Sequence, residues 1–452
     1  MVSLVFEELL VHIERLPFTN QQTPVLLAVP TIADTCSKIS KAAGYETTEK
    51  EDKIAFVDFV SRAAFDMFTA VMYGESPQTT NSRKASREDI EFVQASQRAF
   101  DVTGALLTNP LAKVFGSGLY QDFVVNMDKT FQFANQKTKA YAEQATQQQQ
   151  STQLEMEFQQ EEGRPKRRRR KRDILKAAFG LGRKANSKIN GQSTATTPTA
   201  TSNCPVTQLK NVIPTSFQNP SFVERLVHRG ELSNDEISEA GAPLLMAGVD
   251  TTAYVMSWLY LNLASHPDIQ TKLADELKRV LDGADVTTVE QMEGLPYLVA
   301  CIRESHRLTP PGPVVSKKLD KDVDVVVDGV SYHVQAGTRD SLNLRGIPID
   351  GRFVDNPSEF RPERFLPDAV TARKGTPAEI IDHPAFADPF GRGKRRCLGG
   401  NVAQAEILIL AARMIQDWDI SLEDPSSEWK AKQKLMLKAD PYPAMKLVAR
   451  KY

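Results

Sequence analysis

Cys397 lies where a cysteine thiolate would be stabilised. It ends the glycine-rich, basic stretch Phe390-Gly-Arg-Gly-Lys-Arg-Arg-Cys397, and an apolar-faced helix is predicted to begin just beyond Gly399. Unpaired helix N–H groups, the helix dipole and four nearby cations favour an anionic sulfur. Glycines at 393 and 399 let the backbone approach a flat, bulky ligand, where a Cβ would clash. We therefore expect a thiolate beside a large ligand, with Arg395 available to pair with negative groups of that ligand. The alternative is a buried structural cysteine beside a solvated loop.

A second set of polar residues interrupts the apolar segment 241–264. This segment is just long enough to cross a bilayer of roughly 30 Å, but Asp250 lies in its middle and hydroxyl residues add polar cost. Ionisable groups are expensive in lipid, so a helix buried in a protein core is the favoured interpretation. Asp250 beside the hydroxyl of Thr251 can relay protons in a water-poor cavity. A helix cap or a satisfied buried polar pair is the alternative.

Four segments occur in the order of a known family. Phe-x-x-Gly-x-Arg-x-Cys-x-Gly at 390–399 closely resembles the haem-binding loop of the cytochrome P450 family, the haem-thiolate monooxygenases. Ala247-Gly-Val-Asp-Thr-Thr252 resembles its oxygen-activation motif, and Glu304-Ser-His-Arg307 has its Glu-x-x-Arg form. The segment 360–365 resembles the one that supplies the third member of a Glu/Arg/Arg network. The resemblance spans at least 222–452, with weaker likeness in the helical stretches upstream.

The resemblance implies a haem b cofactor with Cys397 as the axial iron ligand. Asp250 and Thr251 would be catalytic, and Gly248, one turn earlier, would leave room for O₂ against the haem. Lys317 follows a proline-rich turn, where family members often place a cation on a haem propionate. The implied cofactor-binding residues are Gly248, Lys317, Phe390, Gly393, Arg395, Cys397 and Gly399. The implied structural network is Glu304, Arg307 and Arg364, although Glu304 and Arg307 alone would be an ordinary surface pair.

The implied activity uses O₂ and two electrons to hydroxylate an apolar, sterol-like or fatty-acid-like substrate. A ferredoxin or a flavin reductase would supply the electrons. The Ala-Gly-x-Asp-Thr-Thr pattern most resembles that of the family's mitochondrial-type branch, which takes electrons from a ferredoxin. Two alternatives stay open. One is rearrangement of hydroperoxides without a reductase, against which the Asp250-Thr251 pair argues. The other is a truncated or degenerate haem-binding protein without monooxygenase activity.

The elements that must position these residues are mainly helices. Apolar residues recur at three- and four-residue spacing over 54–72 and 90–107, and helical patterns return at 118–143, 267–281 and 295–308. Ser233 and Glu236 supply an N-cap for the long apolar helix. The alternating segment 323–330 predicts a hairpin that turns at Asp328-Gly329. The predicted fold class is mainly α with a small β portion, a cytochrome P450 fold incomplete at its N-terminus, because the family's first elements have no counterpart before residue 54.

Composition changes abruptly after residue 143. Residues 147–150 are all glutamine, 166–172 are seven consecutive basic residues, and 193–202 are almost all Ser, Thr, Ala and Pro. We therefore expect three parts: 1–143 as the N-terminal part of a truncated P450 domain, 144–205 as a disordered insertion, and 206–452 as the haem-binding core. The basic run is more consistent with a solvated loop than with a nucleic-acid surface, because no aromatic residues are interleaved with it.

Overall charge and cysteine usage exclude several classes of protein. The 452 residues carry 56 Lys and Arg against 57 Asp and Glu, so no nucleic-acid partner is expected. The four cysteines are far apart and form neither a disulfide framework nor a zinc cluster. We expect neither a targeting segment nor a membrane anchor in the first residues of this sequence. Localisation is left open, with a mitochondrial or other membrane-associated location implied only by the resemblance.

Overall fold

The computed structural model describes residues 23–49, 53–108, 118–162, 220–392 and 396–451. The chain divides into two compact units, one made of 1–143 with 220–452 and the other of 144–219. All of the predicted site residues belong to the first unit.

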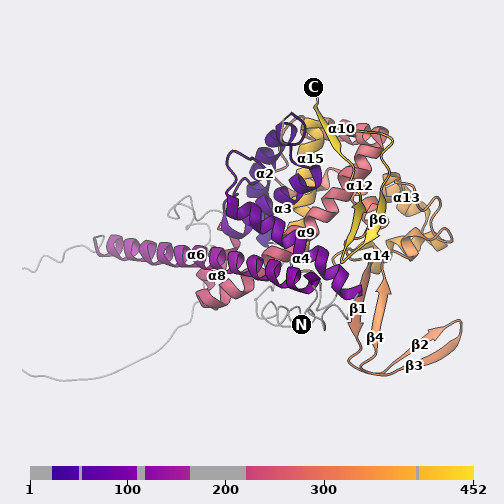
Figure 1. The fold of residues 1–452 in the computed structure, drawn as a ribbon, viewed down its shortest axis with the longest axis horizontal. Helices are drawn as coiled ribbons and strands as arrows, with labels where there is room; N and C mark the ends of the chain where they lie inside the picture. Colours follow the sequence, from indigo (N-terminus) through magenta and orange to yellow (C-terminus); the bar gives the residue numbers. More distant parts are fainter. Residues whose placement is uncertain (1–22, 50–52, 109–117, 163–219, 393–395, 452) are drawn as a thin grey trace, which may run out of the picture. The chain divides into compact units, whose positions relative to one another are not determined.

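Helices make up most of the first unit (Figure 1). Its longer helices are α2 (Thr23–Gly44), α3 (Phe56–Tyr73), α4 (Arg87–Thr108), α6 (Gly118–Glu162, which continues into the second unit), α9 (Asn234–Ser265), α10 (Pro267–Leu281), α12 (Pro296–Leu308) and α15 (Gly400–Asp417). Shorter helices are α8 (Phe222–Arg229), α11 (Val289–Glu293), α13 (Pro367–Ala372) and α14 (Pro384–Ala387). A π-helical turn at Tyr45–Glu49 and 3₁₀ turns at Ile347–Ile349, Pro362–Phe365 and Pro377–Asp382 complete the described helical structure.

The described strands form four antiparallel pairs. The pairs are β1 (Val314–Lys318) with β4 (Arg339–Asn343), β2 (Val323–Val327) with β3 (Val330–Val334), β5 (Trp418–Leu422) with β8 (Met445–Ala449), and β6 (Lys430–Gln433) with β7 (Leu437–Asp440). The predicted hairpin is confirmed as β2–β3, which turns through Asp328 and Gly329 at φ values of 50° and 79°. The predicted fold class, mainly α with a small β portion, is also confirmed.

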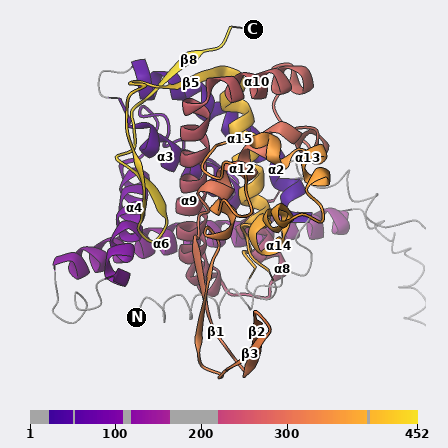
Figure 2. The same ribbon diagram turned by 90° about the vertical axis from the view of Figure 1, so that its right-hand side faces the viewer.

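Helix α9 passes through the core, as the sequence predicted (Figure 2). Ser233 and Glu236 form a capping box at its start, in which each side chain accepts a hydrogen bond from the backbone N–H of the other. Helices α3 and α4 pack against α9, and so do α12 and α15. No helix of the described ranges is long and apolar enough to cross a membrane.

Helix α15 packs on α2, so it connects the two sequence segments of the first unit. Trp418, directly after α15, donates its indole N–H to the Ser40 carbonyl of α2 at 2.9 Å. Its ring covers Gly44, where an added Cβ would lie 2.2 Å from the Trp418 ring. The glycine is therefore needed to let the two elements meet.

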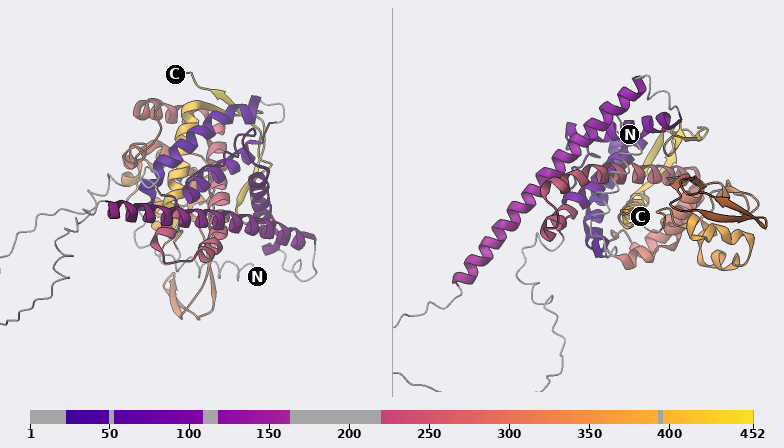
Figure 3. Two further views of the ribbon diagram at one scale, coloured as in Figure 1. Left: turned by 90° about the vertical axis from the view of Figure 1, so that its left-hand side faces the viewer. Right: turned by 90° about the horizontal axis from the view of Figure 1, so that it is seen from below.

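The hairpin β6–β7 lies beside α4 and α9, and its strands are yellow in Figure 3. Trp258 of α9 donates its indole N–H to the Leu437 carbonyl at 2.8 Å. An added Cβ at Gly104 of α4 would lie 2.3 Å from the Leu435 nitrogen, so the hairpin turn approaches the α4 backbone closely. Phe100, Met246 and Met436 form an apolar cluster at this junction.

The first part of the predicted insertion, 144–162, is helical. Helix α6 continues through the glutamine run and ends at Glu162. Glutamine, glutamate and alanine have good intrinsic helix propensity, so a helix that is already nucleated can extend through them without a buried face. The remainder of the predicted insertion, 163–205 with its basic run, lies outside the described residues.

Candidate functional site

Cys397 lies in the loop that leads into α15. Its backbone N–H donates to the Phe390 carbonyl at 2.9 Å, which closes the loop, and its side chain is exposed. The Phe390 ring packs against the start of α15, because an added Cβ at Gly400 would lie 3.0 Å from it. An added Cβ at Gly399 would meet no described atom within 4 Å. The sulfur and the Gly399 backbone are thus accessible to a large ligand.

Within the described part of the loop, the surroundings of Cys397 favour the neutral form of its side chain. Partial burial of the sulfur raises the pKa of Cys397, and this outweighs the backbone N–H groups of Gly399 and Gly400 and the charge of Arg396, which lower it. Arg396 lies 3.7 Å from the Asp388 carboxylate, which also offsets part of its charge. Cys397 would therefore lose a proton when it becomes a metal ligand, and the predicted thiolate stays a prediction.

One stripe of the central helix is open although the helix lies in the core. Ala247 is exposed, and Leu244, Gly248 and Thr251 are partly exposed, at the i, i+3, i+4 and i+7 spacing of a single face. The other faces of α9 are buried over most of its length. A flat apolar ligand would cover this stripe, so the stripe and the accessible Cys397 both fit a haem group.

Gly248 has a packing role that the sequence did not predict. An added Cβ at this position would lie 2.4 Å from the ring of Phe68 on α3. The glycine therefore makes room for a neighbouring helix, and its expected role beside O₂ stays a prediction. Ala247, one residue earlier, is the small residue at the centre of the open stripe.

Asp250 is fully enclosed between helices α9 and α4. Only 1% of it is exposed, and the Ser96 hydroxyl of α4 donates a short hydrogen bond to its carboxylate. Burial raises the pKa of Asp250 to about 7; the Ser96 hydrogen bond and Lys438 lower it, and Asp101 raises it. Asp250 therefore changes protonation near neutral pH, as a proton-transfer group requires.

Thr251 does not contact Asp250 directly. Its hydroxyl donates to the Ala247 carbonyl one turn back at 2.6 Å, and it lies on the open stripe. None of the hydrogen bonds of the described residues joins these two side chains. The two side chains thus lie on different sides of α9: Asp250 points toward α4, and Thr251 lies on the open stripe. A proton that passes between them would therefore need a water molecule.

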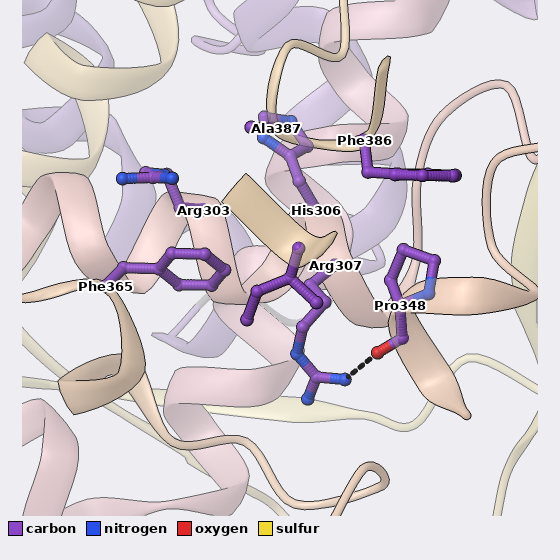
Figure 4. Close-up of a pocket in the computed structure, with 8 residues that line it drawn as sticks. Arg303, His306, Arg307, Pro348, Phe365, Phe386 and Ala387 are labelled. Atoms are coloured by element: carbon purple, nitrogen blue, oxygen red, sulfur yellow. Dashed lines mark hydrogen bonds between the residues drawn. The ribbon is translucent and has the colours of Figure 1, made fainter. Parts of the chain in front are cut away.

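The structure brings Glu304, Arg307 and Arg364 together. Arg307 Nε and Nη2 donate to the two Glu304 oxygens at 2.7 and 2.8 Å, and Arg364 Nε donates to Glu304 Oε1 at 3.2 Å. Arg307 also donates to the Pro348 carbonyl at 2.8 Å (Figure 4). All three residues are buried. The network therefore ties α12 to the irregular segment 347–364, and this is a structural role.

The structure says little about three other predicted cofactor-binding residues. Lys317 lies in β1, exposed and opposite Asp340 of β4. Gly393 and Arg395 lie outside the described residues. Among the described residues there is also no cluster of three or more His, Cys, Asp or Glu that could hold a metal ion, so a haem iron would depend on the single sulfur of Cys397.

The comparison with known families bears directly on this arrangement. The family model described as Cytochrome P450 matches residues 208–445, which includes Asp250, the Glu304 network and Cys397. The chain belongs to the cytochrome P450 family. Proteins of this family bind haem through a cysteine thiolate, and in this P450 chain Cys397 is the residue at the matching place of the motif.

Relatives of this P450 chain include hydroxylases from animals and enzymes from plants. Human mitochondrial sterol 26-hydroxylase is 31% identical over 51% of this chain and 42% of its own length. Sugiol synthase of Salvia miltiorrhiza is 31% identical over 49% of this chain and 43% of its length. Rat mitochondrial 1,25-dihydroxyvitamin D(3) 24-hydroxylase is 32% identical over 45% and 37%. The chain thus spans less than half the length of these curated relatives.

Sequence reasoning missed the residues that surround Asp250. Ser96 and Asp101 of α4, Tyr254 of α9 and Lys438 of β7 all interact with Asp250 or with each other. They come from three separate parts of the chain, and none belongs to a motif. The pairing of α4 and β7 with α9 depends on tertiary packing, which no local pattern reports.

Proposed function

We propose that this P450 chain is a haem-thiolate monooxygenase that hydroxylates an apolar substrate with O₂ and two electrons. The observation that carries the proposal is the accessible Cys397 at the start of α15, together with the open stripe around Ala247 on α9. Bound through a thiolate, haem supplies the oxidising chemistry, because electron density from the sulfur favours O–O cleavage. Two relatives are named as a sterol hydroxylase and a vitamin D hydroxylase, which supports an apolar substrate.

Each site residue then has a defined task. Cys397 would hold the haem iron through its sulfur, and the open side of Gly399 would leave room for the flat ring. Thr251 presents a hydroxyl on the open stripe, and Asp250 accepts and returns protons behind it near neutral pH. Lys317, Phe390, Gly393 and Arg395 complete the proposed cofactor-binding set.

The electron donor and the location are further parts of the proposal. Two relatives carry the word mitochondrial in their names, which supports the ferredoxin-dependent branch, while plant enzymes match with similar identity. A ferredoxin is therefore the first donor to test and a flavin reductase the second. The names of these two relatives support a mitochondrial location, and the family resemblance leaves another membrane-associated location open.

The test is the absorption spectrum of the purified full chain, reduced under carbon monoxide after expression with a haem supply. We expect the red-shifted band typical of thiolate-ligated haem, and we expect Cys397→Ala to abolish it while Cys204→Ala retains it. A Cys397→Ala variant that keeps the band would overturn the assignment. A haem stoichiometry near zero would favour a degenerate protein, and turnover of an added hydroperoxide without an electron donor would favour the rearranging class.

A further inference from the structure

Asp101 of α4 has polar partners on two other elements. Its carboxylate lies 2.5 Å from Lys438 Nζ and 3.2 Å from Lys434 Nζ, both on the hairpin β6–β7. The Tyr254 hydroxyl of α9 donates to the same carboxylate at 3.3 Å. One carboxylate therefore links α4, α9 and the hairpin.

Tyr254 also packs against the apolar cluster of Phe100, Met246 and Met436. Lys438 also stacks on the Tyr254 ring, with its Nζ 4.9 Å from the ring centroid. Side chains of Asp101 and Lys438 are each only 23% exposed. An ion pair between fully solvated side chains contributes little, but a half-buried carboxylate with three partners is held in one geometry.

The same charges act electrostatically on the enclosed carboxylate of Asp250. Ser96 of α4 donates to Asp250, while Lys438 of β7 and Asp101 of α4 act on it electrostatically with opposite signs. Tyr254, one turn further along α9, joins Asp101 by a hydrogen bond. Lys438 in turn also acts on Asp58 of α3. Asp250 is thus acted on electrostatically by a cation and an anion that are paired with each other.

We propose that Asp101 is a positioning residue that fastens the β6–β7 hairpin to α4 and α9 and, together with Lys438, fixes the charge that Asp250 faces. This inference deepens the proposed function, because it concerns the group that the proposed function assigns to proton transfer. Asp101 acts through Lys438 and Tyr254 and touches no reacting atom.

The opposite signs of Asp101 and Lys438 make the proposal testable. Lys438→Met removes a cation and should make Asp250 harder to ionise. Asp101→Asn removes an anion, keeps an acceptor for the Tyr254 hydroxyl, and should make Asp250 easier to ionise. We expect shifts of about 0.5 to 1 pH unit in opposite directions, because Asp101 and Lys438 carry opposite charges.

The measurement is infrared difference spectroscopy of the full chain as a function of pH. Loss of one carboxylic-acid band in Asp250→Asn identifies the Asp250 band, and its pH midpoint is then followed in each variant. Lys432→Met is the matched control, because Lys432 lies on the same hairpin but pairs with the exposed Asp440 at 2.8 Å. This control should leave the midpoint unchanged.

Hydrogen exchange checks the positioning part of the proposal. Backbone amides of 430–440 should exchange several-fold faster in Asp101→Asn than in Lys432→Met. Equal exchange in the two variants, an unchanged midpoint, or shifts in the same direction would overturn the inference. Neither measurement needs turnover or carbon monoxide, so a failure here is distinct from the absence of the thiolate-haem band, which would refute the proposed function alone.

Discussion

Glu304 concentrates four hydrogen bonds on one buried carboxylate. It accepts two from Arg307, one from Arg364 Nε and one from the Arg361 backbone N–H at 3.0 Å. A buried carboxylate of this kind matters for stability mainly because its removal leaves the charges of its buried partners unpaired. The two arginines would remain buried, each with part of its charge unpaired.

Glu304→Ala should therefore destabilise the fold by about 3–5 kcal/mol. Denaturant-induced unfolding, followed by circular dichroism, measures this loss. Glu91→Ala is the control, because Glu91 forms an exposed pair with Arg87 and its removal should cost at most about 0.5 kcal/mol. Equal losses in the two variants would contradict a special role for the buried network.

Asp250 should make stability fall as pH rises through the acidic range. The unfolded carboxyl ionises near its usual pKa of 3.8, whereas burial keeps the folded carboxyl protonated up to about pH 7. Between these values the folded state binds more protons than the unfolded state, so this group's contribution to stability declines from pH 3.8 to about 7 and is constant above. The full decline is about 4 kcal/mol, at roughly 1.4 kcal/mol per pKa unit.

The variant Asp250→Asn lacks this titration. Relative to the unmodified chain, it should gain stability steadily from pH 4 to 7, as measured by denaturant unfolding at each pH. The difference between the two proteins is the useful quantity, because the partly buried His306 acts in the opposite sense. Desolvation lowers the pKa of His306 to about 4, so its contribution to stability rises with pH. A difference that does not vary with pH would contradict the raised pKa of Asp250.

Residue-scale prediction succeeded where chemistry is local and failed where it depends on packing. The capping box at Ser233 and the turn at Asp328-Gly329 follow from neighbouring residues, so the sequence predicts them. The protonation of Cys397 and the role of Gly248 depend on what a folded chain places beside them. In the first case burial outweighs the local charges, and in the second a phenylalanine from α3 occupies the glycine's side.

At the scale of elements, close helix contacts depend on particular glycines. Gly248 lets Phe68 of α3 reach the backbone of α9, and Gly104 lets the β6–β7 turn reach α4. Small residues at such crossings set the distance between elements. The position of α9, and with it the open stripe, is thus linked to a single missing Cβ.

Gly248→Ala should be destabilising by about 1–3 kcal/mol, the usual cost of overpacking, although alanine is the better helix former by about 1 kcal/mol. The clash is with a ring that cannot retract, because Phe68 is 9% exposed and lies between helices. Thermal unfolding would measure the loss. Adding Phe68→Leu should recover part of it, and a double variant that is less stable than the sum of the single changes would contradict the clash.

At the scale of the whole molecule, the first unit is discontinuous in sequence. Residues 1–143 and 220–452 form it together, and the largest helix contacts, α3 with α9 and α2 with α15, cross between the two segments. Burial of apolar surface from both segments holds them together without a continuous chain. The interruption between them is therefore not required for their association.

A protease site inserted at residue 190 tests this directly. After cleavage, the two fragments should elute together in size-exclusion chromatography and separate only in denaturant. The intact chain carrying the same insertion is the control. Fragments that elute apart in native buffer would show that the segments do not form one core.

The contact between α2 and α15 also has a consequence for synthesis of the protein. Ser40 and its partner Trp418 are 378 residues apart in the chain. At a translation rate of roughly 5–20 residues per second, α2 waits about 20–75 s before α15 leaves the ribosome. During that interval the apolar side chains that α2 later buries, such as Ile32 and Ile39, have no partner from α15. The nascent chain should therefore depend on chaperones that cover apolar helices until the last fifty residues have been made.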